Sequence, residues 1–167
     1  MKRVTFSART AAICAALALT GGAYAGTDTT TFNVTITLTS TCDIHTGPTT
    51  NMAFGSVAST ATNVPATSTL TVNCTSLTPY TIALDNGLHG GAGPVRAMQG
   101  GSGTVGYQLY QDSAHSQVWG STTGAGGNVY SGAGTGAAQP LTVYGLVASA
   151  NSPAGNYTDT ITATVSY

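Results

Sequence analysis

Few residues in this sequence are of the types that bind metals. His45, His89 and His115 fall in separate predicted loops, and Asp43, two residues before His45, forms with it a pair that is a weak signal by itself. Metal sites normally place several His, Cys or acidic ligands at short, fixed spacings. We therefore expect no metal site and no cofactor, and we expect three exposed loop histidines.

Residues for covalent or general acid–base catalysis are equally scarce. The chain contains no Gly-x-Ser-x-Gly nucleophile motif, no glutamate, and five scattered aspartates instead of paired acids. The stretch Gly101–Gly106 matches Gly-x-Gly-x-x-Gly, but a predicted strand follows it where a nucleotide-binding motif requires a helix. The sequence therefore predicts a protein that is not an enzyme.

The beginning of the chain has the features of a secretory signal peptide. A positively charged start precedes an apolar run at Ala11–Leu19, and Ala23-Tyr24-Ala25 forms a small-x-small cleavage site. The run is much shorter than the roughly 20 residues that a membrane span needs. We predict a signal peptide over residues 1–25, cleavage between Ala25 and Gly26, secretion, and no membrane insertion.

Removal of the signal peptide leaves Arg96 as the only Lys or Arg residue. Five aspartates against this one arginine give a net charge of −4 with the histidines neutral. Such a chain cannot neutralise a row of phosphates or bind anionic lipid through basic clusters, so nucleic acid is excluded as a partner. Arg96 itself could anchor a ligand carboxylate, although a structural role in pairing with an aspartate or capping a sheet edge is the preferred interpretation.

Cleavage also removes Cys14 and leaves Cys42 and Cys74. Two cysteines in an oxidising compartment allow one disulfide, and two unpaired thiols are the alternative. In the chain-entropy model, this bond would stabilise the fold by roughly 3–4 kcal/mol.

The elements that would position any site are strands. The mature chain is rich in Thr, Ser, Gly and Ala, and it lacks a run with helical periodicity. Short stretches of alternating or apolar residues, separated by Gly, Pro and Asn-Gly turn signals, predict seven or eight strands. The clearest stretches are Thr31–Thr39, Thr67–Cys74, Tyr80–Leu84, Val105–Gln111, Leu141–Ala148 and Tyr157–Tyr167, with a shorter one at Pro94–Met98 and a long loop or hairpin end at Gly120–Gly136. This pattern predicts an all-β fold, an antiparallel β-sandwich in one domain.

The strictest alternation lies close to the mature N-terminus. Along Thr31–Thr39, Thr and Asn occupy one face of the predicted strand, and the other face carries Phe32, Val34, Ile36 and Leu38. Periodicity alone leaves open whether this strand pairs within its own sheet or with a neighbouring molecule.

Several segments, in order and spacing, resemble the spore coat protein U-like domain family, which includes the major pilins of the archaic chaperone–usher pathway. The matching segments are Phe32–Leu38 leading into Cys42, Phe54-Gly55, Leu70–Cys74, Arg96–Met98, Tyr107–Asp112, Trp119-Gly120, Leu141–Gly145 and the ending Ala154–Tyr167. The resemblance implies an immunoglobulin-like sandwich that lacks its final strand, in which a periplasmic chaperone first fills the groove.

The resemblance further implies that, at an outer-membrane usher, a donated N-terminal strand of an identical subunit replaces the chaperone, with Phe32, Val34, Ile36 and Leu38 as anchors. The expected domains are a signal peptide at 1–25, a donor segment at 26–40 and a pilin domain at 41–167. The expected product is a pilus on the cell surface that supports adhesion and biofilm formation. Two alternatives remain: a self-complemented secreted coat protein, and a tip adhesin that binds through exposed tyrosines and loops.

Overall fold

The computed structural model describes residues 25–45, 51–90, 96–101 and 103–167. Most of the predicted signal peptide, parts of the predicted loops that contain His45 and His89, and the start of the predicted strand Pro94–Met98 lie outside the described residues. The chain forms two units, Met1–Thr37 and Leu38–Tyr167, and all the strands of the described chain belong to the second. No helix among the described residues is long and apolar enough to cross a membrane.

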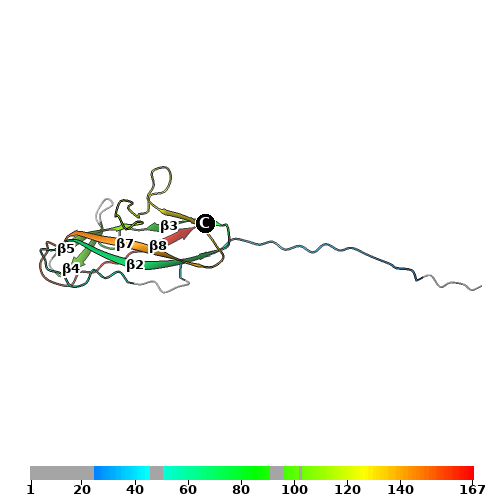
Figure 1. Ribbon diagram of the computed structural model, residues 1–167, viewed down its shortest axis with the longest axis horizontal. Coiled ribbons are helices and arrows are strands. Elements are labelled where there is room, and N and C mark those ends of the chain that lie inside the picture. Colours follow the sequence, from blue (N-terminus) through cyan, green and yellow to red (C-terminus); the bar gives the residue numbers. More distant parts are fainter. Residues whose placement is uncertain (1–24, 46–50, 91–95, 102) are drawn as a thin grey trace, which may run out of the picture. The chain divides into compact units, whose positions relative to one another are not determined.

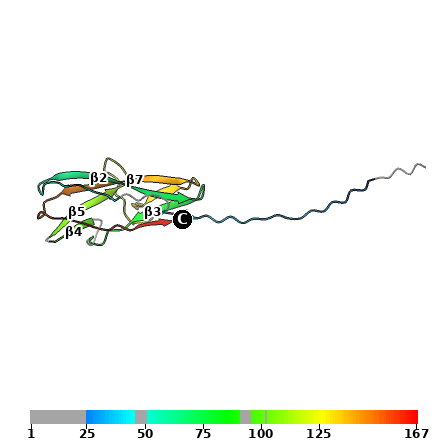
Figure 2. The ribbon, with the colours of Figure 1, turned by 90° about the horizontal axis from the view of Figure 1, so that it is seen from below.

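The second unit is a sandwich of two antiparallel sheets (Figure 1). The larger sheet has the order β1-β2-β7-β5-β4, and the smaller has the order β6-β3-β8. The strand bounds are β1 Cys42–Asp43, β2 Thr62–Cys74, β3 Pro79–Leu84, β4 Arg96–Gly100, β5 Gly103–Tyr110, β6 Tyr130–Ala133, β7 Ala138–Ser149 and β8 Ala163–Ser166. Figure 2 shows β2 and β7 in one layer and β3 and β8 in the other. The predicted all-β, immunoglobulin-like sandwich is therefore confirmed.

Alternation along the strands produces the core. Inward-facing residues of β2, β3, β5 and β7 meet between the sheets because side chains in a strand point alternately to its two faces. Trp119 fills the space beside them, and its indole Nε1 donates a hydrogen bond to the carbonyl oxygen of Ile82 (2.8 Å). The buried apolar residues are Leu70, Val72, Cys74, Tyr80, Ile82, Leu84, Val105, Tyr107, Leu109, Trp119, Val143 and Val147.

A disulfide joins Cys42 of β1 to Cys74 of β2, as the cysteine count predicted. The two residues are also paired in the sheet, and their Cα atoms are 4.1 Å apart. The amide of Thr75 donates to the carbonyl of Thr41 (2.9 Å), next to the disulfide. The chain that enters the sandwich from the N-terminal segment is therefore fixed to the end of β2.

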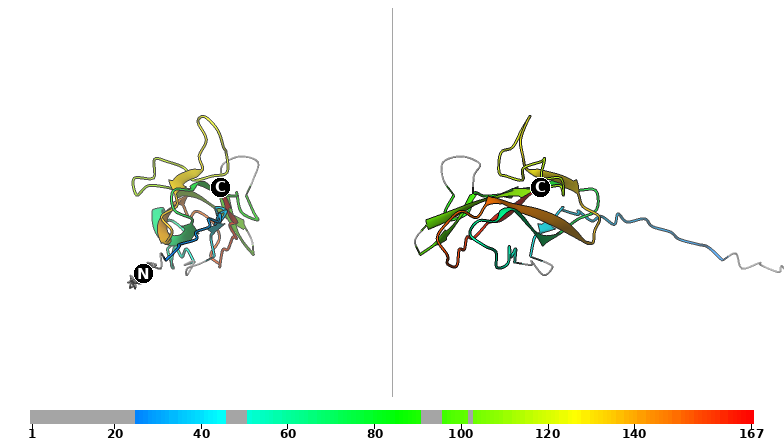
Figure 3. Two further views of the ribbon diagram at one scale, coloured as in Figure 1. Left: turned by 90° about the vertical axis from the view of Figure 1, so that its right-hand side faces the viewer. Right: turned by 60° about the vertical axis from the view of Figure 1, so that its left-hand side comes forward.

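The predictions for the tract at 120–136 and for the last strand of the sandwich need correction. The tract at 120–136, predicted as a loop or hairpin end, contains β6, which pairs with β3; Gly132 lies opposite Tyr80, whose ring occupies the space that a Cβ would need. Figure 3 shows the chain before β6 as loops that project from the sandwich. The predicted strand Tyr157–Tyr167 is shorter than expected: β8 begins at Ala163, because the preceding residues cross from one sheet to the other.

Candidate functional site

The C-terminal stretch of the chain, residues 157–166, forms one wall of an open groove. Thr158 exchanges two backbone hydrogen bonds with Gln99 of β4 (2.9 and 3.0 Å), and the amide of Asp85 donates to the carbonyl of Thr162 (3.1 Å). From Ala163 the stretch pairs with β3. One side of the stretch is therefore paired, first with the larger sheet and then with the smaller.

The other side of this stretch is a sheet edge. β8 is the last strand in the order β6-β3-β8, so no further strand of the described chain pairs with it. Backbone groups of alternate residues point to opposite sides of a strand, and those of Thr162 point toward β3. The N–H and C=O groups of Ile161, Ala163 and Val165 consequently face the unpaired edge. Such an edge is a template for another strand.

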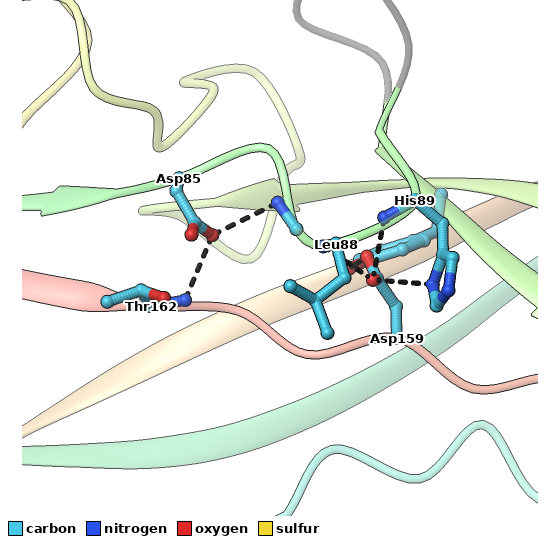
Figure 4. Close-up of polar contacts among 7 residues, drawn as sticks. Asp85, Leu88, His89, Asp159 and Thr162 are labelled. Atoms are coloured by element: carbon cyan, nitrogen blue, oxygen red, sulfur yellow. Dashed lines mark hydrogen bonds and ion pairs between the residues drawn. The ribbon is translucent and has the colours of Figure 1, made fainter.

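Two aspartates hold this wall in place. The side chain of Asp159 is only 3% exposed, and its carboxylate accepts hydrogen bonds from the Tyr107 hydroxyl (2.7 Å) and the amides of Leu88 (3.0 Å) and His89 (3.3 Å). The ring Nδ1 of His89 lies 3.1 Å from the same carboxylate (Figure 4). The loop after β3 and the core residue Tyr107 thus converge on one buried carboxylate.

Asp85 acts in a similar way at the end of β3. Its Oδ1 accepts hydrogen bonds from the amides of Gly87 (3.0 Å) and Thr162 (2.9 Å), as Figure 4 shows. Gly87 has φ +78°, a conformation that glycine adopts readily, and its missing Cβ leaves room for the Asp159 carboxylate. The Asp-Asn-Gly turn signal therefore also makes space for the second aspartate.

The hydrogen bonds keep Asp159 ionised. Burial by itself raises the pKa of this carboxyl, but hydrogen bonds from Tyr107, the Thr160 amide and His89 outweigh it, and the pKa is lowered. Burial also raises the pKa of Tyr107, and the hydrogen bond that its hydroxyl donates to Asp159 raises it further. The pair is therefore a neutral phenol donating to a carboxylate, an arrangement that anchors the wall.

An apolar cleft of about 610 Å³ lies beside this wall. The chain at Asn51–Phe54 forms part of the opposite side, where Met52 and Phe54 are half-buried and pack against the core. Gly145 of β7 permits this packing, because a Cβ there would lie 3.0 Å from Phe54 Cζ and closer still to Met52. The remaining apolar lining is Leu70, Leu84, Met98, Tyr107, Leu109, Val143, Tyr157, Ile161 and Ala163.

A second cavity, of about 940 Å³, continues the cleft toward the loop after β7. The two cavities share Met52, Phe54, Met98, Tyr157 and Thr158. Together they form one groove, which we call the edge groove. Two parts of the chain that are distant in sequence, 51–59 and 152–163, form the sides of this groove. Apolar side chains of the core remain accessible between them.

The predicted strand Thr31–Thr39 is not a strand in the described chain. It belongs to no sheet, and Phe32, Val34, Ile36 and Leu38 are 82–83% exposed. A strand requires a partner for its hydrogen bonds, and this segment has none within its own chain in the described structure. This exposure differs from the self-complemented alternative, in which these side chains would pack in the core of the same chain.

Arg96 has a structural role, as preferred over the anchoring of a ligand carboxylate. It is 1% exposed, and it donates hydrogen bonds to the carbonyls of Asp85 (2.8 Å), Leu84 (3.0 Å) and Trp119 (2.8 Å), and to the Gln108 side chain. Burial lowers its pKa, although a guanidinium remains protonated. Arg96 therefore caps the end of β3 through backbone carbonyls, and of the two structural roles that were expected the described contacts show capping and no ion pair with an aspartate.

Three exposed loop histidines were predicted, and one of them, His45, is exposed. No group of three or more His, Cys, Asp or Glu residues that could hold a metal ion occurs in the part of the chain that the structure describes. The His45 side chain is exposed next to Asp43, as expected. His89 differs, since it contacts Asp159, which is 70 residues away in sequence. His115 is half-buried against the ring of Tyr110 (5.1 Å between ring centres).

Sequence reasoning missed both walls of the edge groove. Asp85 and Asp159 were treated as scattered acids, although each lies in a motif that the chain uses: Asp-Asn-Gly after β3, and Asn-Tyr-Thr-Asp before β8. The alternation of Met52 and Phe54 was the available signal for the second wall. The proposed donor anchors and the cleavage site at Ala25 and Gly26 remain predictions.

Comparisons with known proteins agree with this architecture. The model of the Spore Coat Protein U domain matches residues 28–164. Protein U of Myxococcus xanthus is 37% identical over 109 residues, which are 60% of this chain and 59% of that protein. A chain in the crystal structure of the CsuC–CsuE chaperone–tip adhesion subunit pre-assembly complex, from archaic chaperone–usher Csu pili of Acinetobacter baumannii, superposes with a TM-score of 0.51 at 25% identity.

The structural match covers 78% of this chain and 40% of that chain. The protein thus spans less than two thirds of each of these two relatives. The matched family is described as a spore coat domain and the matched solved complex as a pilus subunit with its chaperone, and neither description is that of an enzyme, in agreement with the prediction made from the missing catalytic motifs. Because the family model covers most of the sequence, this chain belongs to the Spore Coat Protein U domain family.

Proposed function

We propose that this protein is a structural subunit of a chaperone–usher pilus, in which the N-terminal segment of one copy completes the sandwich of the next. The observation that carries the proposal is that one chain has both parts of such a joint. The segment with Phe32, Val34, Ile36 and Leu38 exposes one apolar face, and the edge groove combines an apolar cleft with an unpaired strand edge.

The two parts match in length and chemistry. At about 3.3 Å per residue, Phe32–Leu38 spans roughly 20 Å as a strand, similar to the stretch from Asp159 to Val165. The donor's backbone would bond to the edge at Ile161, Ala163 and Val165, while alternate side chains enter the cleft. Burying each of the four apolar side chains would contribute roughly 1.5–3 kcal/mol.

This contact generates a fibre because it joins two different surfaces. A segment at one end of each copy inserts into a groove on another copy, so the contact is heterologous and need not close into a ring. The groove must be covered before assembly, and the match to a chaperone–subunit complex supports a periplasmic chaperone as the first partner. We further propose assembly at an outer-membrane usher and display on the cell surface, with roles in adhesion and biofilm formation.

A tip position is the second candidate, because the matching solved complex is described as containing a tip adhesion subunit. A shaft subunit would be found along the whole fibre, whereas a tip subunit would be found only at its end. Labelling of fibres with an antibody against this chain separates the two positions.

The proposal is tested on surface-sheared material from cells that make the full chain, run unboiled and boiled on a denaturing gel. Strand donation predicts an unboiled ladder at multiples of the monomer that collapses on boiling. A variant lacking residues 27–38 should give no ladder. A single monomer band in every lane, with the wild-type protein present at the surface, would contradict the proposal and favour a coat protein without fibres.

A further inference from the structure

Leu77, in the turn between β2 and β3, is both strained and exposed. Its φ is +62°, and its side chain is 86% exposed. The other non-glycine residues with positive φ in the described chain are Asn63 and His115, of types that tolerate this region better. A leucine there costs stability, and glycine or asparagine would fold more easily. The side chain of Leu77 therefore has no evident role in the fold of its own chain.

The turn that carries Leu77 is held rigidly. The Leu77 amide donates to the carbonyl of Gly134 (2.8 Å), and the Thr78 amide donates to the carbonyl of Thr75 (3.1 Å). Thr75 is bonded in turn to Thr41, through the Thr41 carbonyl (2.9 Å) and the Thr41 amide (3.1 Å). Leu77 thus lies two residues from the point at which the donor segment joins the sandwich.

The donor segment brings a second copy to this point. If Leu38 is the last residue in the neighbour's groove, only Thr39 and Ser40 separate it from Thr41. A fully extended chain spans at most 3.3–3.6 Å per residue, so the Cα atoms of Leu38 and Thr41 can be no more than about 11 Å apart. The surface of the neighbour must therefore lie directly against the end of the sandwich that carries Leu77.

We propose that Leu77 is a second contact between copies of this chain, which packs against the neighbour at the mouth of its edge groove. The inference rests on the proposed function, and it adds a contact outside the donated strand. A leucine that is held rigidly at the base of the donor segment would restrict the angle between successive subunits.

The strand register identifies the facing surface. All strand pairs in the described chain are antiparallel, and antiparallel pairing is the more stable arrangement for an added strand. A donor antiparallel to β8 would begin beside Val165 and leave the groove beside Asp159. Figure 1 shows the chain between β7 and β8 at the end of the sandwich opposite the C-terminus.

The surface at that end carries exposed apolar side chains among small polar ones. Val57 is 47% exposed, Pro153 and Ala154 are also exposed, and all three line the outer part of the edge groove. The partner surface for Leu77 is therefore the rim at 55–59 and 152–156 of the neighbouring copy. An apolar side chain meeting an apolar rim removes both from water.

Photo-crosslinking tests the contact directly. A photoreactive phenylalanine analogue is placed at position 77 of the full chain, and a control carries it at Thr142, on the exposed face of β7. Fibres are sheared from cells, irradiated and boiled, so that only covalent dimers survive on the gel. We expect dimers from position 77, with the cross-link mapping by mass spectrometry to 55–59 or 152–156, and none from the Thr142 control.

The outcomes separate this inference from the proposed function. An intact unboiled ladder without cross-linked dimers, or with cross-links mapping elsewhere, would overturn the contact but leave strand donation standing. Absence of the ladder in the wild type would overturn both. As a second measurement, Leu77→Gly should raise the melting temperature of the monomer and give fibres that bend more in electron micrographs; unchanged fibre stiffness would count against the contact.

Discussion

Replacing one donor anchor should weaken the junction between subunits without changing the subunit itself. We consider Ile36→Ala, because the Ile36 side chain is 82% exposed in the isolated chain. Exposed substitutions of this kind usually change the free energy of unfolding by less than about 0.5 kcal/mol. Any larger effect must therefore come from the contact with the neighbour.

The expected magnitude follows from the atoms removed. Ile36→Ala deletes three carbon atoms, and each buried methylene contributes about 0.8 kcal/mol, which gives roughly 2.4 kcal/mol in total. At 1.4 kcal/mol per factor of ten, the dissociation constant of the junction should increase roughly 50-fold. A cavity left in the groove would add to this value.

The assay is the temperature at which the ladder collapses on a denaturing gel, measured in parallel for the wild type, Ile36→Ala and Thr35→Ala. Thr35 is the matched control, since it neighbours Ile36 and lies on the opposite face of the donated strand. We expect a clearly lower collapse temperature for Ile36→Ala and little change for Thr35→Ala. Equal effects of the two substitutions would refute insertion of alternate side chains into a groove.

Three further predictions concern the groove and its supports. Asp159→Asn should destabilise the subunit by about 1–3 kcal/mol in urea denaturation at neutral pH, because buried hydrogen bonds to a carboxylate are lost. Since the folded pKa of Asp159 lies below its unfolded value, its contribution is present above the unfolded pKa and is lost as the pH falls through the folded pKa; the acid-induced loss of stability should therefore be smaller in Asp159→Asn. Reduction of the Cys42–Cys74 disulfide should lower the free energy of unfolding by roughly 3–4 kcal/mol, and an unchanged value in denaturant with and without reductant would contradict this. Gly145→Val should displace Met52 and Phe54 and weaken the ladder, with Thr142→Val on the exposed face of the same strand as the control.

Much of the fold could be predicted because it depends on local patterns. Alternation at Tyr80, Ile82 and Leu84 placed these residues on the buried face of β3, and the same argument was correct for Tyr107 and Leu109 of β5. Such alternation indicates which face of a strand is buried. It does not report where pairing begins, so β8 was predicted six residues too early, and β6 was missed in a glycine-rich tract.

The walls of the edge groove depended on contacts between distant residues. His89 and Asp159 are 70 positions apart, and Tyr107 meets Asp159 across 52 positions. No spacing rule connects such residues, because the order of strands in the two sheets brings them together. The same holds for Arg96, whose partners are the carbonyls of Leu84 at the end of β3 and of Trp119.

The sequence by itself determined three features of this protein. These are an alternating apolar segment near the mature N-terminus, two cysteines for one disulfide, and strands without catalytic groups. Only the tertiary structure decided that the segment pairs with no strand of the described chain and that the last strand leaves an edge without a partner among the described strands. The physical reason is that periodicity records which side chains must leave water, whereas hydrogen-bond pairing between distant strands decides where they can go.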